Sequence, residues 1–364
     1  MKHLLAINKI EKVGPVTIKK LWEHFGSIEN AWEANAENIL QVEGINKNAA
    51  EAFIQNRNKI DLNQELEAIR KSDIKVLTLE DKNYPTTLKN IYAPPPVLYL
   101  KGSLQKQDEK AIAIVGTRRA SRYGKEIAKK LAYELSSMGF TIVSGMAAGI
   151  DTVAHQGALE AGGRTLAIFG TGVDVIYPRS NKELSEQISS SGALISEFPI
   201  GADPDKGSFP RRNRVISGLS MGTIVIEGDY TSGAMITAKC ALDQGREVFA
   251  VPGNVEIDQS KGPHWLIKNG AKLVETVDDV LEELNMVRPV MTNDKLKMTN
   301  ECRNYSELSD EQKKIVEVLS LEPKHIDRIV IETSLAISQV SSLLMMLEVK
   351  KIIRQLPGKM FILY

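Results

Sequence analysis

The sequence predicts a doubly wound α/β domain with a smaller, mostly helical domain on either side of it. Between residues 111 and 285, short apolar segments alternate with helical stretches. Continuous apolar strands separated by helices indicate a parallel sheet buried on both faces. The strands are AIAIVG, TIVSG, TLAIFG, ALISEF, TIVIEG and EVFAVPG, and the clearest helices are 124–138, 150–161, 181–190 and 232–244.

Residues 1–65 form a predicted helical domain with a weak internal repeat. Gly14-Pro15-Val16 leads into IKKLWEHF, and Gly44-Ile45-Asn46 leads into KNAAEAFIQ. A glycine turn followed by a helix is typical of a helix-hairpin-helix (SAM-like) pair, in which helix-terminal amides can meet a phosphate. A small bundle whose glycines end helices is an equally good interpretation. A DNA-binding role for this domain therefore stays open.

Residues 66–110 form the lead-in to the main sheet, so the α/β domain spans residues 66–285. A helix in LNQELEAIRKSD precedes a short strand, KVLTL. The run Pro94-Pro95-Pro96 cannot lie inside a helix or a central strand. It predicts a rigid, extended connector to a strand at VLYL.

Residues 286–304 lose periodicity and are a predicted linker. Residues 305–364 contain three helical segments and two short extended pieces separated by Pro-Gly, which predicts a winged helix. The third helix has no arginine and few residues suited to base reading before Lys350. Partner binding is thus as good an interpretation of this domain as DNA reading.

The composition directs attention to local features. The 364 residues have a formal net charge of zero, so attraction to a polyanion would depend on local clusters of Lys and Arg. Asn8 and Lys9 interrupt the first apolar run, and no run of eighteen apolar residues follows. Cys240 and Cys302 lie far apart and form no C-x-x-C pair. We expect a cytoplasmic protein without a membrane span, a metal site or a disulfide framework.

The loops after the strands are the expected place for a ligand, because doubly wound sheets bind ligands beyond the carboxyl ends of their strands. The first loop has three arginines before a helix, where guanidinium groups and helix-terminal amides both suit phosphate. The second is rich in small residues, which allow close approach of a ligand. The five loops are 116–124, 144–151, 170–181, 198–214 and 227–233.

Residues 206–226 carry four basic residues and no acidic one. Such a run is usually a solvated surface, but arginine is also the residue suited to bidentate phosphate contacts and to stacking. Phe209 and Tyr123 are the aromatic residues nearest the basic loops, and either could instead belong to the core. The long loop 198–214 is therefore a candidate nucleic-acid contact.

Several kinds of site are excluded by their missing motifs. There is no G-x-x-x-x-G-K-[ST], and Gly170-Thr171-Gly172 lacks the third glycine of a dinucleotide fingerprint. His155 and His264 have no metal-ligand spacing and are expected to be capping or packed histidines. The acidic residues Glu227, Asp229 and Asp151 form no catalytic constellation. The sequence predicts a protein that is not an enzyme and has no cofactor.

Six motifs, in this order, resemble the DNA-processing protein A (DprA/Smf) family. They are GTRRAS, SGMAAGIDTVAHQGAL, GTGVDVIYPRSN, SEFPIG, FPRRNRVISGLS and EGDYTSGAMITA, and the resemblance runs from about Ile74 to Leu284. It implies an extended Rossmann fold, a homodimer and no nucleotide cofactor. It also implies a protein of natural transformation that binds incoming single-stranded DNA, protects it and helps to load the RecA recombinase.

The loops and the resemblance together give the predicted site. The resemblance implies that Arg179 stands at a position where lysine also occurs in the family, and it places His264 and Leu273 at a dimer face. The predicted DNA-binding residues are Gly116, Thr117, Arg118, Arg119, Ser144, Gly145, Gly149, Arg179, Asn181, Phe209, Arg211, Arg212, Asn213, Arg214, Ser232 and Gly233.

Two other functions are alternatives. The sheet and its glycine-rich loops are similar in outline to the lysine-decarboxylase-like phosphoribohydrolases, which hydrolyse nucleoside monophosphates. The corresponding stretch here, EGDYTSGAMITA, lacks the paired glycines and the catalytic glutamate of those enzymes. An adaptor that binds partners through its winged helix is the second alternative.

Overall fold

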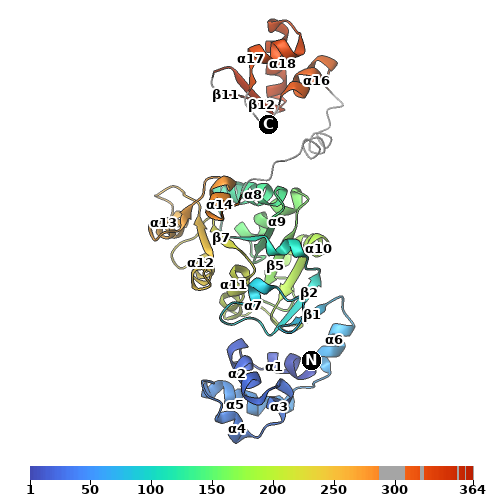
Figure 1. The fold of residues 1–364 in the computed structure, drawn as a ribbon, viewed down its shortest axis with the longest axis vertical. Coiled ribbons are helices and arrows are strands. Elements are labelled where there is room, and N and C mark those ends of the chain that lie inside the picture. Colours follow the sequence, from blue (N-terminus) through green and yellow to red (C-terminus); the bar gives the residue numbers. More distant parts are fainter. Residues whose placement is uncertain (287–307, 320–323, 351, 357, 364) are drawn as a thin grey trace. The chain divides into compact units, whose positions relative to one another are not determined.

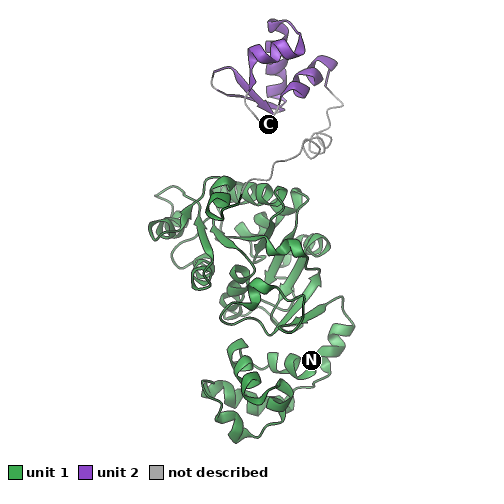
Figure 2. Cartoon of the chain, viewed as in Figure 1, with its two compact units in different colours: residues 1–288 green, residues 289–364 purple. Residues whose placement is uncertain are grey.

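The computed structural model describes residues 1–286, 308–319, 324–350, 352–356 and 358–363. The chain divides into two compact units, Met1–Arg288 and Pro289–Tyr364 (Figure 2). The first unit contains the helical domain and the large sheet. The predicted linker, 286–304, lies outside the described residues except for its first residue.

The helical domain begins the first unit. Pro15 is the first residue of α2, where its fixed φ suits the helix, and Gly26 ends α2 with a left-handed φ of 76°. The two helices that follow the repeated glycine turns are α2 and α5, as predicted. The helices are α1 (Lys2–Asn8), α2 (Pro15–Phe25), α3 (Ile28–Glu33), α4 (Ala36–Leu40) and α5 (Lys47–Asn56), and α6 (Gln64–Arg70) begins at the end of this domain and continues into the lead-in.

The large sheet has nine strands in the order β1-β2-β6-β5-β4-β3-β7-β8-β9. The strands from β6 to β9 are parallel, whereas β1 and β2, from the lead-in, extend one edge in the antiparallel sense. All six predicted apolar strands are present, as β3 to β8. The strands are β1 (Lys75–Thr78), β2 (Val97–Gly102), β3 (Ala111–Val115), β4 (Thr141–Ser144), β5 (Thr165–Phe169), β6 (Ala193–Ser196), β7 (Gly222–Val225), β8 (Glu247–Ala250) and β9 (Lys272–Leu273).

Helices cover both faces of this sheet (Figure 1). Ile112 and Ile114 of β3 belong to a core shared with α8, α9 and α14, whereas Ala113 and Val115 belong to a core shared with α11 and α12. Alternate residues of a strand point to opposite faces, so a strand that is buried on both sides is apolar throughout. The helices are α7 (Thr86–Lys89), α8 (Arg122–Ser137), α9 (Ile150–Glu160), α10 (Lys182–Ser191), α11 (Ser208–Gly218), α12 (Gly233–Asp243), α13 (Lys261–Lys268) and α14 (Val277–Glu283).

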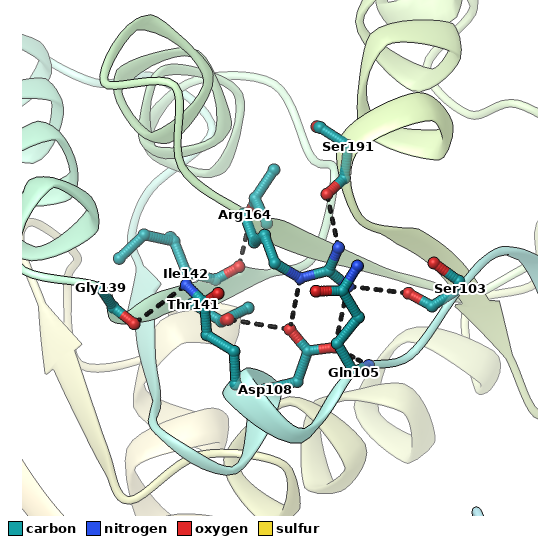
Figure 3. Close-up of polar contacts among 10 residues, drawn as sticks. Ser103, Gln105, Asp108, Gly139, Thr141, Ile142, Arg164 and Ser191 are labelled. Atoms are coloured by element: carbon teal, nitrogen blue, oxygen red, sulfur yellow. Dashed lines mark hydrogen bonds and ion pairs between the residues drawn. The ribbon is translucent and has the colours of Figure 1, made fainter.

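A buried ion pair joins several chain segments at the amino ends of β4 and β5 (Figure 3). Nε and Nη2 of Arg164 each lie 3.0 Å from the Asp108 carboxylate. The guanidinium group also donates to the carbonyl oxygens of Ser103 and Ser191, at 2.8 and 2.7 Å. The Thr141 hydroxyl donates to Asp108 at 2.8 Å. This network holds together the chain segments at the amino ends of the strands, on the opposite side of the sheet from the carboxyl ends.

The described residues of the second unit contain the three helices and the β-hairpin of a winged helix, as predicted. Its core contains Ile315, Ile329, Val340 and Leu344. Its three strands have the order β10-β12-β11. The elements are α16 (Asp310–Val318), β10 (Lys324–His325), α17 (Ile326–Thr333), α18 (Ile337–Val349), β11 (Ile353–Leu356) and β12 (Met360–Leu363).

Among the residues that the structure describes, no single helix is long and apolar enough to span a bilayer. Only α17 and α18 taken together reach that length and hydropathy, and they are bent by 111° at the break between them.

Candidate nucleic-acid interface

The strand order reverses between β3 and β7, so the loops after these two strands meet at the switch point of the sheet. The amide of Thr117, after β3, donates to the carbonyl oxygen of Glu227, after β7, at 2.7 Å. In a doubly wound fold this is where a helix amino terminus commonly faces a phosphate.

Here the protein's own carboxylate lies at that helix terminus. The Glu227 side chain, only 4% exposed, accepts hydrogen bonds from the amide and the hydroxyl of Ser121, the N-cap residue of α8. A Cβ on Gly124 would lie 2.4 Å from the Glu227 carboxyl carbon, so the carboxylate packs directly on the first turn. The amide of the N-cap residue Ser121 is therefore engaged by Glu227 and is not available to a ligand phosphate.

A small hollow of about 80 Å³ lies nearby, at the carboxyl ends of β4 and β5. It brings together four predicted residues from three different segments of the chain. We call it the strand-end pocket, and it is lined by Arg118, Gly145, Ala147, Ala148, Phe169, Gly170, Thr171, Tyr177, Pro178, Phe209 and Arg212.

Two aromatic rings and a guanidinium group lie in contact at this pocket. The Arg118 guanidinium carbon lies 5.1 Å from the centroid of the Phe209 ring, within cation–π range. The Phe209 and Tyr177 rings are 5.7 Å apart and tilted by 40°. Tyr177 was not among the predicted DNA-binding residues, although Tyr177 lies two residues before Arg179 in the same loop. Its 43% exposure makes it available to a stacking partner.

The motif FPRRNR belongs to a helix and not to the predicted loop. Residues 208–214 form the first part of α11, with Pro210 in the first turn. Such a turn accepts proline because its amides have no partner within the helix. The helix points successive arginines in different directions, so they do not form one basic surface.

Arg212 points into the protein and is only 5% exposed. Its guanidinium group donates to the carbonyl oxygens of Gly145 and Ile168, at the ends of β4 and β5. The buried Asp151 carboxylate accepts from the amides of Gly145 and Ala147, at 3.1 and 3.3 Å, and attracts Arg212 electrostatically. Burial lowers the pKa of Arg212 to about 10, so the side chain remains charged at neutral pH. Arg212 thus holds two strand ends together beneath the pocket.

Arg211 and Arg214 share one counter-ion. Nη2 of Arg214 lies 2.5 Å from the Glu197 carboxylate, and Nη2 of Arg211 lies 3.7 Å from it. Glu197 is only 4% exposed and precedes the region in which the sequence showed no acidic residue. The predicted island of positive charge is therefore partly neutralised. Arg211, half exposed, also lies 5.0 Å from the Phe198 ring centroid.

The remaining predicted arginines face solvent. Arg118, Arg119 and Arg179 are exposed, and no carboxylate within the described ranges forms an ion pair with them. These three guanidinium groups are the ones most available to phosphate. Arg119, Arg179 and Arg212 were all predicted to contact DNA. The fold exposes the first two and buries Arg212.

Several other predicted residues shape the loops. Gly149 has a left-handed φ of 85°, and a Cβ there would lie 2.4 Å from the Thr117 carbonyl oxygen. Asn181 is buried and donates to the Met146 carbonyl oxygen at 3.0 Å. The Ser144 hydroxyl donates to the carbonyl oxygen of Ile114, and the Asn213 side chain donates to that of Gly233, at the start of α12. Gly116 packs closely against the Ile150 side chain.

Ser232 has a buried hydroxyl without a hydrogen-bond partner among the described residues.

The two histidines considered from sequence are packed within the fold. His155 is fully buried, and its Nδ1 lies 2.6 Å from the Thr165 hydroxyl. Burial, together with the charge of Arg212, lowers the pKa of His155 to about 3, so the ring stays neutral. His264 is hydrogen-bonded through Nε2 to the backbone of Gly253. Both have the structural roles that the sequence analysis favoured.

Known protein families match three parts of the chain. The model of DNA recombination-mediator protein A matches residues 75–285, that of the DprA winged helix domain matches 302–359, and that of a SAM-like helix-hairpin-helix tandem matches 4–55. Protein Smf of Synechocystis is 37% identical over 385 aligned residues, covering 98% of this chain and 97% of that protein. DNA processing protein DprA of Bacillus subtilis is 44% identical over 220 residues, covering 60% and 74%.

Two solved structures share the fold. The X-ray structure of DNA processing protein A from Streptococcus pneumoniae has a TM-score of 0.68 at 35% identity, covering 78% of this chain and 98% of that one. The corresponding protein from Helicobacter pylori, described for its single-stranded DNA binding mode, has a TM-score of 0.52 at 31% identity and covers 58% and 95%. The predicted resemblance is confirmed, and the chain belongs to the DNA recombination-mediator protein A family.

Proposed function

We propose that this protein binds single-stranded DNA at the carboxyl edge of its large sheet, without catalysing a reaction. The observation that carries the proposal is a set of three exposed arginines, Arg118, Arg119 and Arg179, that form no ion pair within the described ranges. Arg118 lies over the Phe209 ring, which in turn contacts Tyr177. Single strands are held in this way, by cations along the backbone and by aromatic surfaces under the bases.

The two kinds of contact have separate tasks. The arginines contact successive phosphates, and the strand-end pocket receives a base against Phe209 and Tyr177. The buried residues Arg212 and Asn181 shape the pocket and add no exposed contact of their own. The single-stranded DNA binding mode described for the Helicobacter pylori relative supports this assignment.

Membership of the family supports a role in natural transformation, in which the protein protects incoming DNA and promotes loading of RecA. A homodimer would form through the surface of α13 and β9. Trp265 and Leu273 are 46% and 39% exposed there, and neighbouring exposed apolar side chains favour an interface. His264 lies on the same helix and orders the adjoining loop through Gly253.

The absence of catalysis is part of the proposal. Glu227 is the carboxylate at the switch point, and its oxygen atoms accept hydrogen bonds from Ser121. It is therefore engaged in structure. Incubation with nucleoside monophosphates should release no free base, and a measured release would favour the hydrolase alternative.

The binding proposal is tested by titrating a fluorescent oligothymidine with the wild-type protein and with Arg118→Ala and Arg179→Ala. Each variant should bind more weakly and should lower the slope of log affinity against log salt by about 0.7 for each phosphate that is no longer neutralised. Arg122→Ala is the matched control, because Arg122 is 93% exposed but is paired with Glu126 at 2.7 Å. An affinity that does not depend on salt would exclude the proposed contacts.

A further inference from the structure

The segment after β6, residues 197–202, is fastened to the loop that follows β5. The amide of Gly172 donates to the carbonyl oxygen of Ala202 at 2.8 Å. The amide of Gly201 donates to both oxygens of the Asp174 carboxylate, at 2.9 and 3.1 Å. The position of the loop that lines the strand-end pocket therefore depends on the position of residues 197–202.

Hydrogen bonds on either side of this segment reach the pocket lining itself. The Ser196 hydroxyl donates to the carbonyl oxygen of Thr171, and the Ser208 hydroxyl donates to that of Gly170, each at 2.5 Å. Gly170 and Thr171 both line the pocket. A displacement of residues 197–202 would therefore move two of its walls.

The helical domain holds the same segment from its other side. The carboxylate of Glu65, in α6, accepts a hydrogen bond from the amide of Ile200 at 3.0 Å and pairs with Lys9 Nζ at 3.1 Å. The Asn8 side chain, at the end of α1, donates to the carbonyl oxygen of Glu197 at 2.9 Å. Glu65 is only 3% exposed. A buried carboxylate is destabilising unless it is paired and hydrogen-bonded, so these contacts are integral to the fold.

The two parts of this unit also share one apolar core. Leu5 and Ile7 of α1 belong to the same buried cluster as Tyr99 of β2 and Ile188 of α10. The cluster also includes Met146, from the loop after β4. The helical domain is thus packed into the sheet domain close to the loops that carry the site.

The second of the two repeated turns of the helical domain is occupied by the domain's own side chains. Lys20 Nζ donates to the carbonyl oxygen of Gly44 at 2.7 Å. The Asn46 side chain caps α5 by accepting from the amide of Asn48 at 2.9 Å. Acidic and basic residues occur in nearly equal numbers in residues 1–60. These features favour a supporting role for the domain over a phosphate-binding role.

We propose that the helical domain positions the DNA site, and that Glu65 is the positioning residue through which it does so. Glu65 holds the amide of Ile200, residues 197–202 hold the loop after β5, and that loop forms the pocket. This inference rests on the proposed function, since it assigns a role in the binding of single-stranded DNA.

The test compares the full-length Glu65→Ala protein with the wild type. Hydrogen exchange should be faster at the amides of Ile200, Gly201 and Gly172 in the free protein. Affinity for a fluorescent oligothymidine should fall roughly twofold to thirtyfold, the range for coupling through a packed network. The salt slope should stay unchanged, because the same phosphates remain neutralised. Glu67→Ala is the control, since Glu67 lies on the same helix with a 63% exposed side chain.

Asn8→Ala provides a second variant in case Glu65→Ala does not fold, because it removes a separate hydrogen bond to the same segment. It should accelerate exchange around Glu197 and Phe198 and should also weaken binding. Unchanged exchange in the folded variants, or accelerated exchange with unchanged affinity, would overturn the positioning role. A wild-type protein that did not bind the oligonucleotide would refute the proposed function and this role with it. The exchange data would still show whether Glu65 holds the segment.

Discussion

The buried guanidinium group of Arg212 donates a hydrogen bond to the carbonyl oxygen of Gly145, 67 residues earlier in the chain. A second bond reaches Ile168, so a single side chain joins the ends of two neighbouring parallel strands. Both strands lead into loops that line the strand-end pocket. The contribution of Arg212 to binding is therefore expected to act through the shape of the pocket.

Replacing Arg212 by Met should lower both stability and affinity. The substitution leaves two carbonyl oxygens and the buried Asp151 without their cation, and we expect a decrease of about 3–5 kcal/mol in the free energy of unfolding, measured with urea. Arg164→Met is the control, because it breaks a comparable buried network at the opposite edge of the sheet. It should destabilise similarly but leave the affinity of the folded protein unchanged. Equal weakening of binding by both variants would show a general effect of stability.

Gly149→Ala should be much more harmful than Gly162→Ala. Both glycines have positive φ values, 85° and 65°, which alanine rarely adopts. At Gly149 the new Cβ would also meet the Thr117 carbonyl oxygen at 2.4 Å, whereas at Gly162 no atom lies within 4 Å. Thermal unfolding should show the difference. Similar melting temperatures for the two variants would contradict the close approach of the two loops.

Phe209→Ala should remove a stacking surface without removing a charge. We expect binding of the oligonucleotide to weaken by about 1–3 kcal/mol, the range for one stacked base, with an unchanged salt slope. Tyr92→Ala is the control, because Tyr92 is an aromatic residue with 87% exposure that does not line the pocket. Fluorescence anisotropy at two salt concentrations separates the outcomes. A reduced salt slope for Phe209→Ala would mean that the ring acts through Arg118.

His155 predicts a specific dependence of stability on pH. Its pKa is lowered to about 3 in the folded protein, so below pH 6.5 the unfolded chain takes up a proton that the folded protein does not. The contribution of neutral, buried His155 to the free energy of unfolding is complete above pH 6.5. It is lost as the pH falls from 6.5 towards 3. Between pH 6.5 and 5 the decrease should be about 2 kcal/mol, and His155→Gln should remove it. Urea unfolding at several pH values measures this, and an equal slope in the variant would contradict the assignment.

The sheet was predictable because its strands obey a simple rule. Segments buried on both faces are mainly apolar, and β3 to β8 all have consecutive buried apolar residues, with polar residues mostly at the strand ends. The start of α11 was not predictable in the same way, because it lacks the apolar periodicity of a helix. Pro210 and three arginines come before Val215, where the apolar residues resume. That turn is helical because a proline is accepted there and because the fold supplies partners for the arginines.

The roles of individual arginines depend on residues that are distant in sequence. Arginine is rarely buried, so nothing local distinguishes Arg212 from Arg211. Arg212 is internal because two strand ends offer carbonyl oxygens to it, and Arg214 is paired because Glu197 lies close to it at the end of β6. The sequence could identify the loops that form the candidate site. It could not tell which of their arginines are exposed to a ligand and which hold the loops in place.

The carboxylate of Glu227 also bears on competition between ligands. A free mononucleotide that entered the switch point would meet the carboxylate of Glu227, which already accepts hydrogen bonds from the amide and the hydroxyl of the N-cap residue Ser121. A strand that crosses the exposed arginines and the strand-end pocket need not disturb Glu227. We therefore expect mononucleotides to compete poorly with single-stranded DNA, because a carboxylate lies where a doubly wound fold commonly holds a single phosphate.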